Sequence, residues 1–290
     1  MPRIVLGTAN FNQFYGLRNK KFSKSEIRKV MPAFLNKSKI NHIDTALDYN
    51  ISADLINSLK IKNLRVTTKV KLPKDKKNIF LKTLKKRLKT QLKNLRIKNY
   101  EAILIHDLRD LKTENGKKLL KILEDFKKEK KTKMIGASLY SPNEIIKTFQ
   151  IMKMDIVQFP LNIFNSNFVT KKWINFFKKK QIKIQIRSVF LQGLLLLNKE
   201  NLDELKINKY LRNHLIRFNK WIKKNKMSSV LVSINFIKKY YPVIDYIIIG
   251  SDNYPQLLQN IKLLKSKKTN FKLKKFSSIN EKIIDPRKWN

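Results

Sequence analysis

The chain contains no cysteine and only 6 glycines and 8 prolines in 290 residues. The lack of cysteine excludes disulfides, zinc-thiolate sites, iron-sulfur clusters and a thiol nucleophile, and it argues against a disulfide-stabilised secreted protein. No apolar run approaches 18 residues, and no long apolar region follows Met1-Pro2-Arg3, so we expect neither a membrane span nor a secretion signal. We therefore expect a cytoplasmic protein whose residues 1–290 form a single domain.

Acidic residues are scarce, since 21 Asp and Glu face 65 Lys and Arg and give a formal net charge of +44. Such a charge could indicate a non-specific nucleic-acid binder. However, leucines recur at helical spacing in the segment 78–99, with lysines at positions between them. Aromatic residues that could stack on bases do not interleave with the charge. We interpret the lysines as solvated helix faces and expect no specific nucleic-acid partner.

The few glycines form neither a G-x-G-x-x-G nor a G-x-x-x-x-G-K-[ST] motif, so an open doubly wound sheet with a dinucleotide turn is the weaker alternative. Eight short apolar runs predict strands at 4–9, 42–46, 65–70, 101–107, 133–139, 156–161, 183–189 and 246–251. Helices are expected at 78–99, 116–131, 143–152 and 168–180, and the connection 194–245 is long enough for two more. Ser228 or Ser229 could cap the second of these. This alternation predicts an α/β protein with a closed (β/α)8 TIM barrel.

Four polar residues lie at or just past the ends of three consecutive predicted strands: Asp44, Tyr49, Lys69 and His106. Right-handed crossovers bring the carboxyl ends of parallel strands to one edge, where barrel active sites are built. A tyrosine hydroxyl is a poor acid near neutrality, but a nearby ammonium such as that of Lys69 lowers its pKa. Asp44 would orient Lys69, and His106 would hydrogen-bond the reacting oxygen. The four residues therefore predict a proton-transfer site with Tyr49 as the acid.

In order and spacing these residues resemble the aldo-keto reductase family, in bacterial-type members. Asp44 precedes Tyr49 by five residues, Lys69 follows Val66-Thr67-Thr68, and His106 follows Ile103-Leu104-Ile105. Further matching motifs are Leu6-Gly7-Thr8-Ala9, Ile135-Gly136-Ala137-Ser138, Val157-Gln158-Phe159-Pro160-Leu161-Asn162, Ile249-Gly250-Ser251 and the terminal Asp285-Pro286-Arg287-Lys288-Trp289. The resemblance therefore extends over nearly the whole chain.

The resemblance implies a barrel that binds NADP(H) without a Rossmann fold and reduces an aldehyde, a ketone or a sugar-derived carbonyl to an alcohol. Ser138 and Gln158 would contact the nicotinamide amide, Ser251 the phosphate end of the adenosine, and Gln259 and Asn260 the adenine. Arg187, Ser188, Gly250 and Gln256 complete the expected cofactor-binding set. No metal site is expected. A cofactor-binding regulatory or interaction barrel with little turnover is the alternative.

Three departures from the family pattern affect these expectations. Leu139 stands where an asparagine usually follows the fifth-strand serine, so one contact to the nicotinamide amide is lost. Arg187 stands where an aromatic residue often stacks on the nicotinamide, and its guanidinium could cover the nicotinamide ring or bind an anionic substrate. Gly250 and Gln256 stand where Lys or Arg often holds the 2′-phosphate, with Asp252 nearby, so NAD(H) remains an open alternative to NADP(H).

Overall fold

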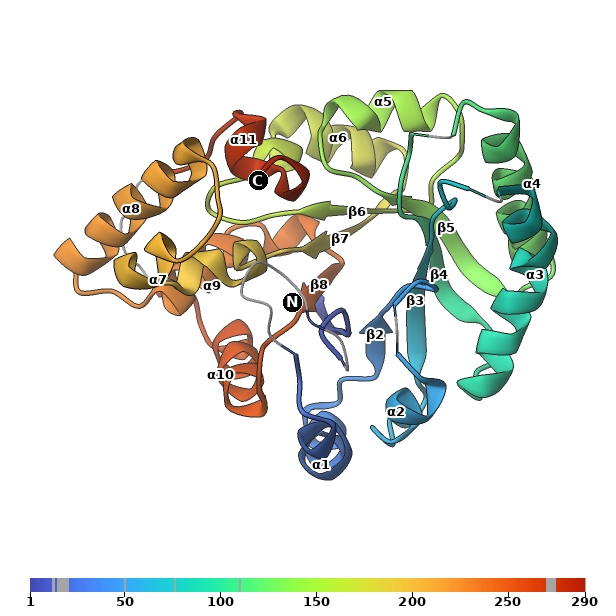
Figure 1. Cartoon of the computed structure of the whole chain (residues 1–290), viewed down its shortest axis with the longest axis horizontal. Coiled ribbons are helices and arrows are strands. Elements are labelled where there is room, and N and C mark those ends of the chain that lie inside the picture. The colour runs from blue at the N-terminus through green and yellow to red at the C-terminus, as the bar shows by residue number, and fades with distance from the viewer. Residues whose placement is uncertain are drawn as a thin grey trace.

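The strands form a closed parallel barrel in the order β1 to β8, with the helices around its outside (Figure 1). The structure is a computed structural model that describes residues 1–11, 14, 21–49, 51–75, 77–109, 111–269 and 275–289. The strands are β1 Arg3–Gly7, β2 His42–Asp44, β3 Arg65–Val70, β4 Tyr100–Ile105, β5 Thr132–Ser138, β6 Ile156–Pro160, β7 Lys183–Arg187 and β8 Tyr246–Ile249. The predicted (β/α)8 barrel is confirmed.

Parallel pairing continues around the whole barrel and closes it between the first and the last strand, where Arg3 pairs with Tyr246. Most expected strands extended slightly too far at their carboxyl ends, because the chain there leaves the ladder. After β1, for instance, Thr8 turns and its hydroxyl donates a hydrogen bond of 2.9 Å to the Asp44 carbonyl. The segments after the strand ends thus become the loops of the upper barrel face.

The helices cover the barrel and connect its strands. They are α1 Met31–Ser38, α2 Ala53–Asn57, α3 Lys77–Asn94, α4 Glu114–Lys128, α5 Asn143–Phe149, α6 Lys171–Lys179, α7 Lys199–Asp203, α8 Lys209–Lys224, α9 Ser229–Lys238, α10 Tyr254–Lys265 and α11 Glu281–Ile284. The expectation of one helix over 168–180 is wrong in part, because the extended residue Thr170 separates the 3₁₀ turn Asn167–Val169 from α6. Ser228 caps α9, as predicted, and accepts from the Leu231 amide at 3.4 Å.

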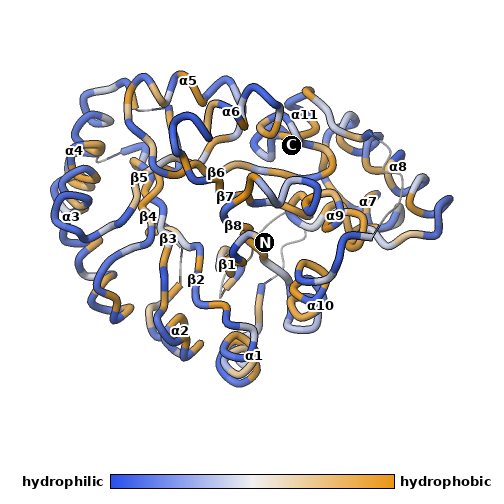
Figure 2. Tube along the Cα trace, turned by 180° about the vertical axis from the view of Figure 1, so that it is seen from behind, coloured by the Kyte–Doolittle hydropathy of each residue, from blue (hydrophilic) through white to orange (hydrophobic). Residues whose placement is uncertain are grey.

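Apolar faces of the helices and strands form the core, visible as orange stretches along the strands in Figure 2. In α3 the buried residues are Leu81, Leu84, Leu88 and Leu92, whereas most lysines between them are exposed. A smaller cluster fills the barrel interior with Val5, Ala102, Leu104, Ile156 and Tyr246. The helical leucine pattern therefore does mark a core-facing stripe with a solvated basic face.

Strands β5 and β6 approach too closely for a side chain at one position. A Cβ atom added to Gly136 would lie 1.8 Å from the carbonyl oxygen of Ile156. This glycine lets the two strands pair so that Ser138 and Gln158, at the upper ends, lie in register.

Within the described segments, no helix is both long and apolar enough to span a membrane.

Candidate active site

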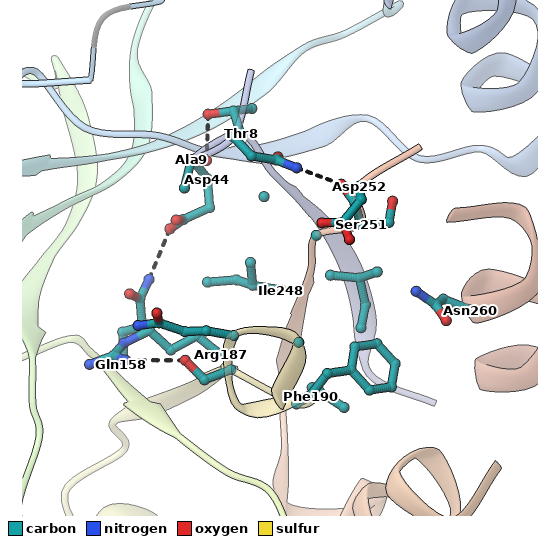
Figure 3. Close-up of a pocket in the computed structure, with 18 of the residues that line it drawn as sticks. Thr8, Ala9, Asp44, Gln158, Arg187, Phe190, Ile248, Ser251, Asp252 and Asn260 are labelled. Carbon is teal, nitrogen blue, oxygen red and sulfur yellow. Dashed lines mark hydrogen bonds between the residues drawn. The ribbon is translucent and has the colours of Figure 1, made fainter. Parts of the chain in front are cut away.

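A cleft opens at the carboxyl ends of the strands, with about 1140 Å³ of empty space including its mouth. It collects eleven of the thirteen expected site residues, namely Asp44, Tyr49, Lys69, His106, Gln158, Arg187, Ser188, Gly250, Ser251, Gln256 and Asn260. Figure 3 shows Asp44, Gln158 and Arg187 on one side of the cleft and Ser251, Asp252 and Asn260 on the other. Tertiary folding thus brings together residues from loops that are far apart in the sequence.

Two expected residues do not line the cleft. Ser138 is only 1% exposed and lies behind Gln158, to whose side-chain oxygen its hydroxyl donates at 3.4 Å. Gln259 lies on α10 with its side chain exposed. The geometry of the cleft therefore does not support a direct contact of Ser138 with the nicotinamide amide or of Gln259 with the adenine.

A buried ion pair lies at the floor of the cleft. The Lys69 ammonium pairs with one carboxylate oxygen of Asp44 and donates to the Thr45 carbonyl at 2.9 Å. The other Asp44 oxygen accepts from the Gln158 amide at 2.8 Å (Figure 3). Because both charged side chains are under 8% exposed, each depends on the other for compensation. Gln158 therefore orients Asp44. Sequence patterns did not indicate this role of Gln158.

Tyr49 lies beside this pair, with the Lys69 nitrogen 5.4 Å from the centre of its ring. The expectation that the nearby Lys69 brings the pKa of Tyr49 below its ordinary value is wrong for this structure. Burial raises the pKa of Tyr49, and the carboxylates of Asp44 and Asp48 raise it further. The Asp44 carboxylate neutralises much of the Lys69 field, and a partly buried phenolate would be poorly hydrated. Tyr49 consequently keeps its proton at neutral pH, as a proton donor must.

His106 faces Tyr49 at the end of β4, with the ring centroids 6.5 Å apart. Burial, together with the Lys69 ammonium, lowers the pKa of His106 to about 4, so the ring is neutral at pH 7. Its Nδ1 atom is buried and has no hydrogen-bond partner among the residues that the structure describes. A neutral imidazole can donate one hydrogen bond to a reacting oxygen without competing with Tyr49 as an acid.

Arg187 ends β7 on the same side of the cleft. Its guanidinium donates to the Leu139 carbonyl at 3.1 Å and lies 4.4 Å from the centre of the Tyr140 ring. The chain then turns sharply, because Ser188 has a φ of 56°, and the Asn162 amide holds the Ser188 carbonyl at 3.0 Å. A non-glycine residue in the left-handed region has to be held by its surroundings, and these contacts fix Arg187 and Ser188 in the cleft.

The far end of the cleft has features that fit a phosphate-bearing ligand. The Ser251 hydroxyl is buried and has no partner in the described part of the chain. A Cβ atom on Gly250 would meet nothing within 4 Å, so space remains open beside it. Gln256 is less available than expected, because its side-chain oxygen accepts from the Asp252 amide at 3.1 Å. Ser251 and Gly250 therefore fit the phosphate end of a nucleotide cofactor.

Several cleft residues were missed by the sequence reasoning. Asn10 donates to the Ser251 carbonyl at 2.6 Å and so ties the loop after β1 to the loop after β8. Tyr140 lines the cleft beside Arg187, and Phe190 closes its lower side in Figure 3. The turn after β7 was detectable in part, since Gln192-Gly193 occupies the left-handed region with φ of 55° and 89°. No local signal marks Asn10 or Tyr140, because their neighbours come from distant loops.

A parallel barrel with its polar cleft at the carboxyl ends of the strands has the architecture of a barrel enzyme. The chain belongs to the aldo/keto reductase family, whose model matches residues 3–283. It is accordingly an oxidoreductase of a family that reduces carbonyl compounds with a nicotinamide cofactor.

Solved structures of similar fold include the holo form of the aldo-keto reductase AKR11C1 from Bacillus halodurans. It has a TM-score of 0.68 and 16% identity, and the match covers 92% of this chain and 88% of that one. The glycerol dehydrogenase AKR11B4 from Gluconobacter oxydans has a TM-score of 0.63 and 21% identity over 92% of this chain and 88% of its own. Comparison with curated protein sequences gives no match.

Proposed function

We propose that this protein reduces the carbonyl of an aldehyde, a ketone or a sugar-derived substrate to an alcohol, with Tyr49 as the general acid. The observation that carries the proposal is the cleft floor, where a protonated Tyr49 lies beside the Asp44–Lys69 ion pair and the neutral His106. A donor of this kind accelerates proton transfer to a developing alkoxide by about 10² to 10⁴.

Each side chain has a distinct role in this proposal. Tyr49 transfers its phenolic proton to the carbonyl oxygen as negative charge develops there. The Lys69 ammonium stabilises the phenolate left behind, and Asp44 holds that ammonium in place. His106 fixes the carbonyl oxygen with a hydrogen bond. Because the phenolate forms only as the proton is transferred, the Lys69 charge stabilises that stage of the reaction more than the starting complex.

The nicotinamide cofactor supplies the hydride when bound. Ser251, Gly250 and Asn260 would hold its adenosine and phosphate end, while Arg187, Ser188 and Gln158 line the opposite end of the cleft. We propose NADP(H) as the cofactor on the usual preference of the family. NAD(H) is the competing outcome, because the Asp252 carboxylate lines the same end of the cleft and would repel a 2′-phosphate.

The proposal includes a single domain and a cytoplasmic location. The barrel strands extend from Arg3 to Ile249, and the segment Glu281–Ile284 packs against α8, which supports one unit. The absence of cysteine fits a reducing compartment.

The test is fluorescence titration of the purified protein with NADPH and NADH, followed by assays of cofactor oxidation with a panel of carbonyl compounds. Tyr49→Phe removes only the hydroxyl and should lower kcat by at least about 10² while cofactor affinity stays within about twofold. Binding of a cofactor without turnover on any carbonyl would instead favour a regulatory barrel. If neither cofactor binds, the proposed reduction is wrong.

A further inference from the structure

Among the residues that the structure describes, one cation in the cleft has no carboxylate as a counterion. Lys69 is paired with Asp44, but among the described residues no carboxylate lies within ion-pair distance of Arg187. Its side chain is half-buried at the end of β7 and lines the cleft. A partly desolvated guanidinium that has neutral neighbours is well suited to bind an anion from solution.

The guanidinium is held so that some of its donors remain available. It donates to the Leu139 carbonyl at 3.1 Å and to the Ser188 hydroxyl at 3.4 Å, and its central carbon lies 4.4 Å from the centre of the Tyr140 ring. A guanidinium has five N–H donors, and these two contacts leave others for a bidentate partner. Arg187 is therefore preorganised rather than freely rotating.

Arg187 also lies near the reacting centre. Its positive charge acts on both Tyr49 and His106, favouring the phenolate of the first and the neutral ring of the second. An anion held by Arg187 would thus be part of the same small molecule whose carbonyl reaches Tyr49, or else part of the cofactor.

Resting on the reductase function proposed above, we propose that the substrate carries a carboxylate or phosphate group which Arg187 binds. The Arg187 guanidinium lies against the Tyr140 ring and carries a positive charge that no described carboxylate pairs. The uncompensated charge therefore makes anion recognition the best explanation for an arginine here.

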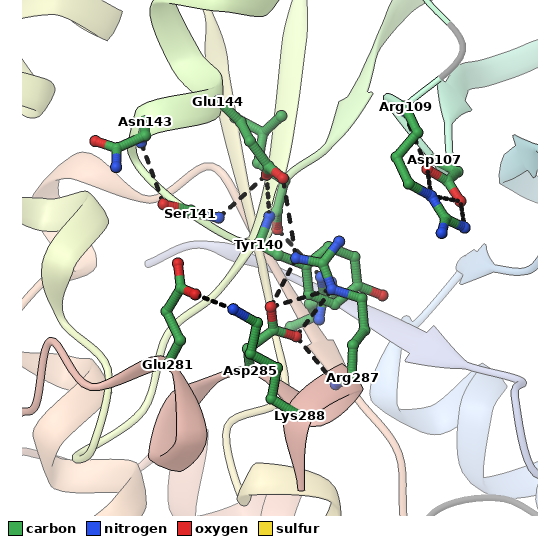
Figure 4. Close-up of polar contacts among 12 residues, drawn as sticks. Asp107, Arg109, Tyr140, Ser141, Asn143, Glu144, Glu281, Asp285, Arg287 and Lys288 are labelled. Carbon is green, nitrogen blue, oxygen red and sulfur yellow. Dashed lines mark hydrogen bonds and ion pairs between the residues drawn. The ribbon is translucent and has the colours of Figure 1, made fainter.

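A second guanidinium supports Tyr140 from the C-terminal segment. Arg287 lies 4.1 Å from the centre of the Tyr140 ring and is itself held by Asp285 at 2.6 Å (Figure 4). Glu144 accepts from the Tyr140 amide at 2.6 Å and lies 4.0 Å from Arg287. Because its charge is compensated by these two carboxylates, Arg287 is a positioning residue that acts on Arg187 through Tyr140.

The experiment compares matched substrates that differ in charge. Succinic semialdehyde is compared with butanal, and glyceraldehyde 3-phosphate with glyceraldehyde, by the ratio of kcat/KM within each pair. The wild type should prefer the anionic member of at least one pair by tenfold or more, and the pair with the larger ratio identifies carboxylate or phosphate. In Arg187→Ala that ratio should fall by about 10- to 100-fold, the range expected for losing hydrogen bonds to a charged group. Arg187→Lys should retain part of it.

A control variant separates local from global charge effects. Lys153→Ala removes one exposed positive charge before β6, at the opposite end of the barrel, and should leave both ratios unchanged. Arg287→Ala should raise KM for the anionic substrate several-fold with a smaller change in kcat, and Arg287→Lys should restore part of that loss. A ratio near one in the wild type, or a ratio that Arg187→Ala does not reduce, would overturn the proposal.

Failure of this inference is distinguishable from failure of the reductase function. Succinate and inorganic phosphate are added to the protein without cofactor, and binding is measured by calorimetry, so no turnover is needed. At least one anion should bind the wild type and bind Arg187→Ala at least tenfold more weakly. If Arg187→Ala instead weakens NADPH or NADH binding and leaves anion binding intact, Arg187 serves the cofactor and the proposal is wrong.

Discussion

Replacing Asp44 by asparagine removes one charge of the buried pair and leaves the Lys69 ammonium without compensation. Both side chains are under 8% exposed, and apart from Asp44 the ammonium has the Thr45 carbonyl at 2.9 Å. Breaking a buried pair in this way costs about 3–5 kcal/mol. An independent upper limit on this cost comes from the alternative in which the lysine loses its proton. Keeping a lysine neutral at pH 7, about 3.4 pH units below its reference pKa, costs about 4.6 kcal/mol. Since the replacement amide can still accept a hydrogen bond, we expect a loss of about 3 kcal/mol.

The assay is urea unfolding of the wild type, Asp44→Asn, Lys69→Met and the double variant. The double variant contains neither charge, so its loss should be at least about 2 kcal/mol smaller than the sum of the two single losses. The folded Asp44→Asn protein binds fewer protons than its unfolded chain if it releases the lysine proton, so its stability relative to wild type should rise from pH 7 to pH 9. Strictly additive single losses would show that the two charges are not coupled, and the reasoning would fail.

Two further predictions concern stability. Burial and the charges of Arg65 and Arg3 lower the pKa of His42 to about 3, so the unfolded chain takes up a proton near pH 6.5 that the folded chain does not bind. Lowering the pH from 7 to 4 should therefore reduce the free energy of unfolding by about 3 kcal/mol through this group. In urea unfolding of His42→Gln, the loss of stability between pH 7 and pH 4 should be smaller by that amount. A pH dependence equal to that of the wild type would contradict this prediction. Gly136→Ala should cost more than about 2 kcal/mol, because its new carbon meets the Ile156 backbone. Gly250→Ala, which meets nothing within 4 Å, should change stability by under about 0.5 kcal/mol, and equal effects of the two would be inconsistent with this packing.

The sequence by itself determined the barrel and the edge at which the proposed catalytic residues lie. Alternation of apolar runs with helical leucine patterns allows little else than parallel strands, and parallel strands with right-handed crossovers put Asp44, Lys69 and His106 at the same edge. Tyr49 was instead recognised through the resemblance of its spacing from Asp44 to the family pattern. These properties depend on periodicity and chain direction, which are local and therefore readable in the sequence.

Only the tertiary structure decided the electrostatics and the contacts of the cleft. The pKa of Tyr49 rises because burial and the Asp44 carboxylate outweigh a Lys69 charge that is already paired. Gln158 is bound to Asp44, and Ser138 lies behind it. The contacts of Arg187 with Tyr140, and of Tyr140 with Arg287, join three segments distant in the sequence. Burial and pairing are sums over neighbours that folding brings together, and for that reason no local pattern could predict them.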